Sequence, residues 1–337
     1  MSPEELKRYE KQIILEEVGV EGQKRLKNGC VLVVGAGGLG CPALLQLATA
    51  GVGTIGIVDG DQVEISNLPR QPLYNDADLH CNKALVAARK LSQINPHISL
   101  TPYPYYLNEK NIDEITQAYD IIIDGSDQPS SRYLISDWSI QRGMAHIYGA
   151  VEGMQGHVAV FNIANSQNET CSYRDLFQEP PPSLSSCKEA GIIGMVPHCI
   201  GTFQALEAMK LILGLKSPLH SHLLVTDFKT YIERLIALPF SAISHVAYRL
   251  KPASQNPLSI SPKELCHLLS SSTPPLLIDI RNALFKQILS LPADRLIVLH
   301  CKTGKKSREV ASKLKQLLPE KDIRYLTPSQ TKTFSFF

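Results

Sequence analysis

The chain has 337 residues, a formal net charge of +2 and 44% hydrophobic residues, enough for one large core and a smaller one. The weak charge gives no sign of nucleic-acid binding, and neither a signal peptide nor an apolar run long enough to cross a bilayer is found. The 8 cysteines lack the paired spacing of a secreted scaffold, so we expect a cytoplasmic protein with reduced thiols.

The first predicted strand, Val31 to Val34, runs directly into a glycine-rich turn and then a helical stretch from Pro42 to Thr49. Gly35, Gly37 and Gly40 match the dinucleotide fingerprint, in which glycines permit a tight turn and close approach of the backbone to phosphate. Alone, this pattern is most typical of a nicotinamide or flavin enzyme.

A second predicted strand, Ile55 to Val58, ends at Asp59, roughly 20 residues after the glycine turn, where a ribose hydroxyl usually finds its acceptor. The residues that follow are ones that hydride transfer does not need. Cations can neutralise a transferring phosphoryl group, and a carboxylate at a strand end can hold magnesium. A triphosphate and magnesium site is therefore predicted from Ser66, Asn67, Arg70, Lys83 and Asp127.

Further strand-like runs, at Ile121 to Ile123 and Val158 to Phe161, alternate with helical stretches such as Lys83 to Gln93. This order predicts an α/β fold with a Rossmann-like, mostly parallel sheet, whose ligand lies at the carboxyl ends of the strands. The apolar helix from Gly201 to Leu213 is interpreted as core or dimer packing. After Leu250, prolines and small polar residues predict a linker.

These motifs, taken in order from about Arg8 to about Phe228, resemble the MoeB/ThiF family of ubiquitin-activating-enzyme-like adenylyltransferases. The resemblance rests on Arg8 to Leu15, Gly35 to Pro42, Asn67 to Gln71, Ile94 to His97 and Gly153 to Phe161.

The resemblance implies an enzyme that uses ATP and Mg²⁺ to convert the carboxyl end of a small protein to an acyl-adenylate. It implies that Gly38 and Asp59 seat the nucleotide, that Asn67, Arg70 and Lys83 hold the phosphates, and that Asp127 carries magnesium. The expected nucleotide-site residues are Gly35, Gly37, Gly38, Gly40, Asp59, Asp61, Ser66, Asn67, Arg70, Lys83, Asp127 and Gln128, with Arg8 and Lys11.

Two departures from the family pattern concern charge and metal. Lys11 stands where the family often has an arginine that reaches the phosphates of the partner subunit, and lysine lacks the planar fork of arginine. The paired cysteines that hold zinc in many members are also missing, since Ser172 and Asp175 occupy the first pair. We therefore expect no zinc.

Two cysteines are candidates for sulfur chemistry. Cys187 follows a proline-rich segment and resembles the family thiol that attacks the acyl-adenylate. Cys301 lies between a predicted strand and a helix from Glu309 to Leu318, in a loop rich in glycine and lysine that would stabilise a thiolate. This loop resembles that of a rhodanese, although the module looks shortened. The other cysteines discussed are expected to be buried and inert, namely Cys30, Cys41, Cys81, Cys199 and Cys266.

We expect three parts: an adenylation domain at residues 1–245, a linker at 246–262 and a truncated rhodanese-like domain at 263–337. The predicted catalytic residues are Arg70, Lys83, Cys187 and Cys301. The predicted partners are a ubiquitin-like sulfur-carrier protein ending in Gly-Gly, a sulfur donor of the cysteine desulfurase type and a second copy of the chain.

Three alternatives stay open. With an inert Cys301 the protein would only activate its carrier. A nicotinamide-dependent oxidoreductase would leave Arg70, Lys83 and Asp127 unexplained, and a non-catalytic carrier-binding protein would fit the substitution at Lys11 and the shortened module. The sequence does not identify the carrier or whether the pathway makes molybdopterin, thiamine, a thiolated tRNA or a secondary metabolite.

Overall fold

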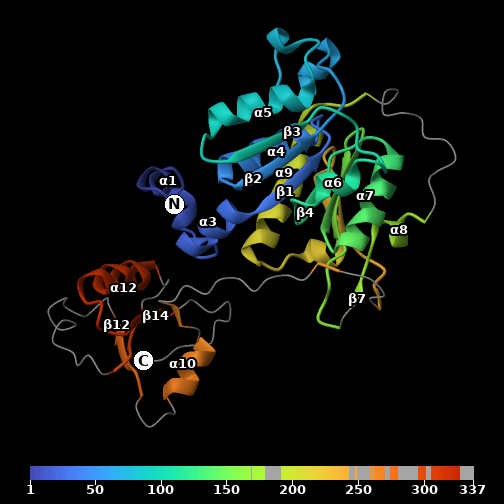
Figure 1. The fold of residues 1–337 in the computed structure, drawn as a ribbon. Helices are drawn as coiled ribbons and strands as arrows, with labels where there is room; N and C mark the ends of the chain where they lie inside the picture. The colour runs from blue at the N-terminus through green and yellow to red at the C-terminus, as the bar shows by residue number, and fades with distance from the viewer. Residues whose placement is uncertain are drawn as a thin grey trace. The chain divides into compact units, whose positions relative to one another are not determined.

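The computed structural model describes residues 1–167, 169–178, 191–242, 247–248, 259–260, 262–269, 274–279, 295–300 and 305–326. The chain divides into two compact units, Met1–Ser254 and Gln255–Phe337 (Figure 1). This division falls inside the linker predicted for residues 246–262. The first unit extends past residue 245, because Tyr248 pairs with Ile163.

The first unit is built on a single large sheet. Its strands are β1 Cys30–Val34, β2 Thr54–Val58, β3 Ser99–Tyr103, β4 Ile121–Asp124, β5 Ala145–Glu152, β6 Gln155–Phe161, β8 His222–Asp227 and β9 Ile232–Ala237, with β7 Glu169–Thr170 and β10 Ser241–Ala242 as a separate pair. Its α-helices are α1 Pro3–Arg8, α2 Glu10–Ile13, α3 Gly19–Asn28, α4 Gly40–Ala50, α5 Lys83–Ile94, α6 Ile112–Thr116, α7 Pro129–Arg142, α8 Tyr173–Leu176 and α9 Met195–Leu213. Its 3₁₀-helices are η1 Ile65–Arg70, η2 Asp76–Asp78 and η3 Pro218–His220.

The sheet has the strand order β3-β2-β1-β4-β5-β6-β8-β9. Strands β3, β2, β1, β4 and β5 are parallel, so their carboxyl ends meet at one edge. The run from Val158 to Phe161 is a strand as predicted, but it belongs to β6, which pairs antiparallel to both β5 and β8. The parallel half is thus continued by an antiparallel half.

Successive residues of each parallel strand face opposite layers, as the period of two requires. Val31 and Val33 pack with α4, α5 and α9, whereas Leu32 and Val34 pack with α6 and α7 on the other face (Figure 1). Both faces are therefore covered by helices, which explains why β1 is apolar throughout. No helix among the described residues has the length and apolar character needed to span a membrane.

A buried tyrosine helps to hold the N-terminal helices against the rest of the first unit. The hydroxyl of Tyr9 accepts a hydrogen bond from the side-chain amide of Asn95 at 2.8 Å. A Cβ at Gly51 would lie 2.5 Å from the Tyr9 ring, so the ring occupies space that only glycine leaves open. The same Asn95 amide donates to the carbonyl of Ala48 at 2.6 Å, which joins three parts of the chain.

The second unit contains a four-stranded parallel sheet in the order β11-β14-β13-β12. Its core includes the fully buried Ile297, Leu299 and Leu314. Its elements are β11 Ser259–Ile260, α10 Pro262–Leu269, β12 Leu276–Asp279, β13 Ile297–His300, α12 Lys305–Leu317 and β14 Ile323–Leu326. The elements of this unit begin at Ser259, earlier than the predicted residue 263.

Candidate active site

The glycine turn between β1 and α4 has the predicted strand, turn and helix arrangement. A Cβ at Gly40 would lie 1.8 Å from the carbonyl oxygen of Gly35, so the first helical residue must be glycine. Gly35 itself has a φ of +90° and a Cβ there would lie 2.8 Å from the carbonyl oxygen of Gly125. These two glycines shape the turn.

Gly37 and Gly38 have more room around them. A Cβ at Gly37 would come no closer than 3.6 Å to another residue, the side-chain nitrogen of Gln71, and one at Gly38 would lie 3.3 Å from Pro197. The backbone here is open to a ligand, and it leads into the N-terminus of α4, where free N–H groups favour an anion.

Asp59 follows β2 directly and lies against the glycine turn, as the sequence predicted. Its carboxylate accepts from the backbone N–H of Ala36 at 2.7 Å and from that of Asp61 at 2.8 Å. Burial raises the pKa of Asp59, although the Lys83 ammonium and the two backbone hydrogen bonds oppose this shift. Each carboxylate oxygen has a further lone pair, so a ribose hydroxyl can still donate to it.

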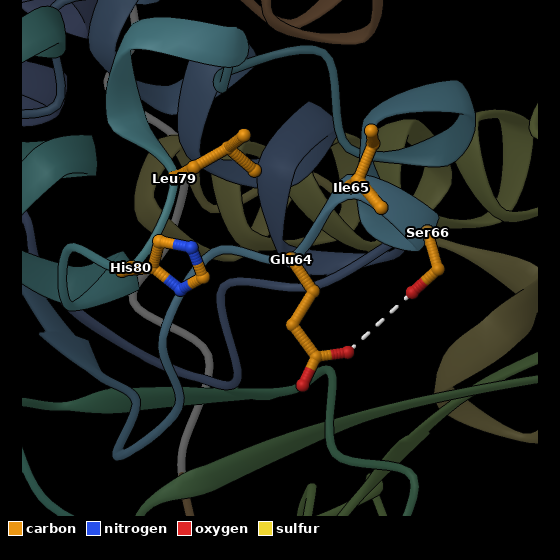
Figure 2. A pocket seen from close by; sticks show the side chains of 5 residues that line it. All are labelled: Glu64, Ile65, Ser66, Leu79 and His80. Atoms are coloured by element: carbon orange, nitrogen blue, oxygen red, sulfur yellow. Dashed lines mark hydrogen bonds between the residues drawn. The ribbon is translucent and has the colours of Figure 1, made fainter.

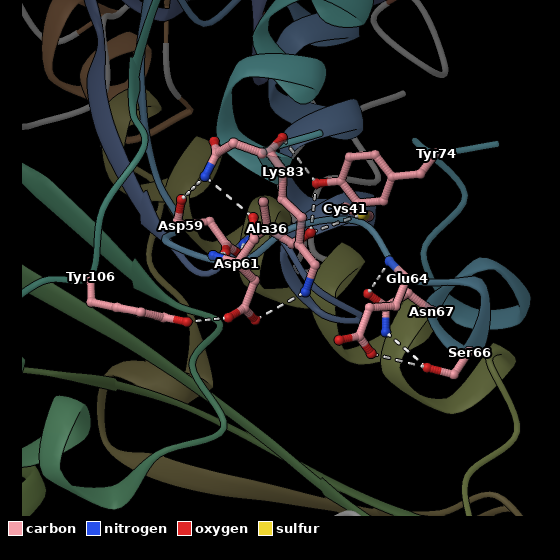
Figure 3. Close-up of polar contacts among 11 residues, drawn as sticks. Ala36, Cys41, Asp59, Asp61, Glu64, Ser66, Asn67, Tyr74, Lys83 and Tyr106 are labelled. Carbon is pink, nitrogen blue, oxygen red and sulfur yellow. Dashed lines mark hydrogen bonds and ion pairs between the residues drawn. The ribbon is translucent and has the colours of Figure 1, made fainter. Parts of the chain in front are cut away.

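Lys83 is the first residue of α5, and its side chain is only 7% exposed. Its ammonium lies 3.0 Å from the carboxylate of Asp61, and that carboxylate also accepts a hydrogen bond from the hydroxyl of Tyr106 (Figure 3). The side-chain amide of Asn82 donates to the carbonyls of Asp59 and Asp61, which ties the start of α5 to the end of β2. The structure thus brings Asp59, Asp61 and Lys83 together, and it adds Tyr106, which we did not predict.

The helix η1 carries the predicted phosphate ligands Asn67 and Arg70. Asn67 is 6% exposed, and its side-chain oxygen accepts from the backbone N–H of Glu64 at 3.3 Å. The Arg70 guanidinium donates to the carbonyl of Ser66 at 2.6 Å, so it folds back on its own helix. Arg70 must turn away from this carbonyl to reach a phosphate.

A pocket opens beside η1. Figure 2 shows Glu64 and Ser66 on the side of η1 and Leu79 and His80 on the segment that leads to α5, with Ile65 completing the wall. Ser66 donates to the Glu64 carboxylate at 3.4 Å, so its hydroxyl is directed toward this pocket's acidic residue. The pocket lies next to the predicted phosphate residues without including Arg70 or Lys83 in its lining.

Gln71, the last residue of the Asn67 to Gln71 motif, is a site residue for which the sequence predicted no role. It is 3% exposed, its side-chain nitrogen lies nearest to Gly37, and its buried oxygen has no hydrogen-bond partner among the described residues. A buried unpaired acceptor is costly, so a donor from a ligand would stabilise it.

Asp127 and Gln128 follow β4 at the same edge of the sheet. Gln128 is the N-cap of α7, and Asp127 is exposed, with no hydrogen bond or ion pair to any residue that the structure describes. The preceding Gly125 and Ser126 lie against Gly35, which places Asp127 beside the glycine turn. A free carboxylate at this point is the kind of ligand that Mg²⁺ uses, together with phosphate oxygens and water.

The site therefore fits a nucleoside triphosphate with magnesium. It has an open glycine turn at a helix N-terminus, a buried ammonium, a buried carboxylate for ribose and an unpaired carboxylate for metal. Asp59, Lys83 and Asp127 would hold the ribose, the phosphates and Mg²⁺, respectively.

Arg8 and Lys11 lie elsewhere within the chain. The Arg8 guanidinium donates to the carbonyl of Ile94, at the opposite end of α5 from Lys83, about 16 Å along the helix axis. The Lys11 side chain is 88% exposed and pairs with Glu10. Neither reaches the site of its own chain, so their predicted role requires a second copy.

The cysteine predictions are only partly tested. Cys187 and Cys301 lie outside the described residues, as does the side chain of Cys266. Cys41 is buried as predicted, and its burial raises the pKa of its thiol to about 12. Cys81 is exposed, so the prediction that it is buried was wrong.

Cys30 and Cys199, which were also predicted to be buried, are half-buried, and Cys171 of the same unit is buried. The helix predicted from Glu309 begins earlier, at Lys305, so Lys305 and Lys306 belong to α12 and not to the loop after Cys301.

Comparison with known proteins gives a family match over most of the first unit. The model of the ThiF family matches residues 9–240. A sulfur carrier protein adenylyltransferase of Thermus thermophilus is 46% identical over 228 residues, which cover 66% of this chain and 84% of the relative. The probable adenylyltransferase/sulfurtransferase MoeZ of Mycobacterium tuberculosis is 35% identical over 351 residues, covering 94% and 90%.

The adenylyltransferase and sulfurtransferase MOCS3 of Arabidopsis thaliana is 34% identical and covers 94% of this chain and 73% of its own. The two relatives that align with both units carry both activities in their names. The Thermus protein, which aligns with less of the chain, is named for adenylyl transfer alone.

Solved structures share the fold. PaaA superposes with a TM-score of 0.61 at 21% identity, covering 72% of this chain and 75% of that one. Escherichia coli MccB with MccA-N7isoASN gives a TM-score of 0.62 at 21% identity, covering 72% and 73%. The same enzyme crystallised with ATP gives 0.58 at 21% identity, covering 66% and 68%.

Proposed function

This chain belongs to the ThiF family, and we propose that it is an ATP-dependent adenylyltransferase that activates the C-terminal glycine of a ubiquitin-like sulfur-carrier protein. The observation that carries the proposal is that one edge of the sheet has both the buried Lys83 ammonium, next to Asp61, and the unpaired Asp127 carboxylate, next to the open glycine turn. Hydride transfer needs neither group, which argues against a nicotinamide enzyme.

The reaction follows from the residues at this edge. A carboxylate oxygen of the carrier attacks the α-phosphorus of ATP, the bond to the β-phosphate oxygen breaks, and pyrophosphate leaves. Lys83, Arg70 and the N–H groups at the start of α4 would neutralise the phosphate charge, and Asp59 would orient the ribose. Bound Mg²⁺, held by Asp127, would supply further charge withdrawal from the phosphates.

We further propose that the activated carrier receives sulfur. The Cys187 thiol would attack the acyl-adenylate and displace AMP, which leaves a thioester. The terminal sulfur of a Cys301 persulfide, formed by a donor of the cysteine desulfurase type, would displace Cys187 and give an acyl disulfide. The released Cys187 thiol would cleave this disulfide to the thiocarboxylate, and an external thiol would reduce the Cys187–Cys301 disulfide that remains. The names of the two relatives that span both units support this step. Lys11 of a second copy would complete the phosphate site, which favours a homodimer, and the reduced thiols that this chemistry needs suit the cytoplasm.

The decisive test is ATP–pyrophosphate exchange with candidate carriers that end in Gly-Gly. Asp127→Ala should abolish exchange, because it removes the metal ligand. Asp120→Ala is the matched control, since Asp120 is an exposed aspartate just before the other end of the same strand β4. Cys187→Ala and Cys301→Ala should leave exchange intact and stop transfer of sulfur from a cysteine desulfurase to the carrier.

The alternatives predict different results. Tight binding of NAD in place of ATP would indicate an oxidoreductase. ATP binding without exchange for any carrier would indicate a non-catalytic carrier-binding protein. Exchange without sulfur transfer in the wild type would leave adenylation as the whole activity.

A further inference from the structure

Two neighbouring tyrosines in the connection between β3 and α6 differ in what they contact. Tyr105 and Tyr106 are both exposed, at 44% and 59%. Tyr105 lies against the ring of Tyr103, whereas the Tyr106 hydroxyl donates to the carboxylate of Asp61. Only Tyr106 of this pair turns toward the nucleotide site (Figure 3).

The Tyr106 ring is aimed by the backbone at Gly60. A Cβ at Gly60 would lie 2.8 Å from the ring carbons, so the ring rests directly on the glycine. Gly60 has no left-handed φ, so its backbone does not itself demand glycine. The space that Gly60 leaves open is what lets Tyr106 reach Asp61.

Asp61 connects Tyr106 to Lys83. One of its carboxylate oxygens accepts from the Tyr106 hydroxyl and the other pairs with the Lys83 ammonium at 3.0 Å. The two side chains approach the carboxylate from opposite sides (Figure 3). Since the Asp61 side chain is 50% exposed, whereas that of Lys83 is 7% exposed, the hydroxyl holds the more exposed end of this contact.

The charge around Tyr106 keeps its hydroxyl a donor. The hydrogen bond to Asp61, followed by the charge of Asp61, burial and the charges of Asp59 and Asp127, raises the pKa of Tyr106 to about 12. Tyr106 is thus protonated at neutral pH and close enough to the predicted metal ligand to sense its charge.

We propose that Tyr106 is a positioning residue of the nucleotide site: its hydroxyl fixes Asp61, and Asp61 fixes the Lys83 ammonium for the triphosphate. This inference rests on the proposed function. Tyr106 lies outside the motifs that identify the family. Gly60 supports its role, because the absence of a side chain at Gly60 leaves space for the Tyr106 ring.

The test measures nucleotide affinity of the full-length protein together with the kinetics of ATP–pyrophosphate exchange. Tyr106→Phe keeps the ring and removes the hydroxyl, so it should raise the Kd and KM for ATP about three- to tenfold. Its kcat should change less than about twofold, because the affected contact is with bound nucleotide. Affinity for adenosine, which has no phosphate, should stay unchanged. Tyr105→Phe is the matched control and should leave all four quantities as in the wild type.

Gly60→Ala supplies an independent variant, since the new methyl group displaces the Tyr106 ring without altering its chemistry. It should weaken ATP binding to a similar extent as Tyr106→Phe. In a Tyr106→Ala background, Gly60→Ala should add no further loss, because nothing is left to displace.

The outcomes separate this inference from the proposed function. If the wild type binds ATP and Tyr106→Phe binds it equally well, the positioning role is overturned while the adenylyltransferase stands. An equal loss of adenosine and ATP affinity would also overturn it, because the defect would then not act through phosphate. A wild type that does not bind ATP would overturn the proposed function itself.

Discussion

The imidazole Nε2 of His146 lies 3.4 Å from a carboxylate oxygen of Asp124, and both side chains are fully buried. The other carboxylate oxygen accepts from the backbone N–H of Ser126 at 3.0 Å and from its hydroxyl at 2.6 Å. Burial by itself raises the pKa of Asp124, but the His146 hydrogen bond and the charge of Arg132 outweigh it and lower the pKa. This buried carboxylate therefore holds the segment that presents Asp127.

Asp124→Asn should destabilise the protein by about 3 kcal/mol, because it removes a buried carboxylate that is hydrogen-bonded to His146 and Ser126. Chemical denaturation would measure the change. Asp120→Asn, on an exposed aspartate just before the start of the same strand, should stay within about 0.5 kcal/mol of the wild type. Equal stability of the two variants would show that the Asp124 contacts contribute nothing.

Two substitutions in the glycine turn should differ in their effect on stability. Gly40→Ala should destabilise the first unit by at least about 2 kcal/mol, because its Cβ would lie 1.8 Å from the Gly35 carbonyl oxygen. The free energy of unfolding of Gly37→Ala should lie within about 1 kcal/mol of the wild-type value, because a Cβ at this position has room. The same methyl group should weaken ATP binding, because it would crowd the phosphates. Thermal unfolding and ATP titration of the two variants would decide this, and a folded Gly40→Ala variant of normal stability would contradict it.

Stability should fall in acid partly through Glu5. The hydrogen bond from Lys27 at 2.5 Å, together with that from the Ser2 backbone, lowers the pKa of Glu5 from 4.5 to about 2. A carboxylate with a lowered pKa contributes stability above its unfolded pKa, and this contribution is lost as the pH falls from about 4.5 toward 2.

Glu5→Gln should therefore lose stability near neutral pH and depend less on pH over this range than the wild type. Unfolding in denaturant at several pH values would reveal the difference between the two slopes. Glu16→Gln, at an exposed position, should follow the wild-type slope. Parallel slopes for Glu5→Gln and the wild type would rule out the proposed contribution.

The first unit should keep adenylation without the second. Among the described residues, the core clusters of the two units share no member, so a fragment of residues 1–254 keeps the three clusters of the first unit. We expect this fragment to unfold cooperatively and to catalyse ATP–pyrophosphate exchange at a rate within about threefold of the full chain. Sulfur transfer should be lost with Cys301. A fragment that folds but does not exchange would show that the second unit takes part in adenylation.

Features that depend on neighbouring residues were predicted well from the sequence. The glycine turn, Asp59 and the start of α5 at Lys83 follow from apolar periodicity and from the steric demands of Gly35 and Gly40. The alternating order of strands and helices likewise gave the parallel half of the sheet. The family was predicted from a resemblance that the ThiF match over residues 9–240 confirms, whereas the truncated rhodanese-like domain stays a prediction.

Features that depend on distant residues were missed. Tyr106 contacts Asp61, which is 45 residues away in the sequence, and His146 contacts Asp124, which is 22 residues away. Neither contact leaves a recognisable pattern among neighbouring residues. The start of α12 was predicted too late for a different reason. Lys305 and Lys306 are charged, and charged residues in the first turn of a helix resemble those of the preceding loop. Cys81 was misjudged because it precedes the buried face of α5 without belonging to it.

The contact between Tyr9 and Asn95 has a consequence for how the chain assembles during synthesis. The N-terminal helices leave the ribosome first, but the groups that hold Tyr9 come later, Gly51 after α4 and Asn95 only after α5. The ends of an 86-residue loop must meet before the tyrosine can pack, and such distant contacts form slowly. The earliest-made segment can therefore complete its packing only after residue 95 has been made.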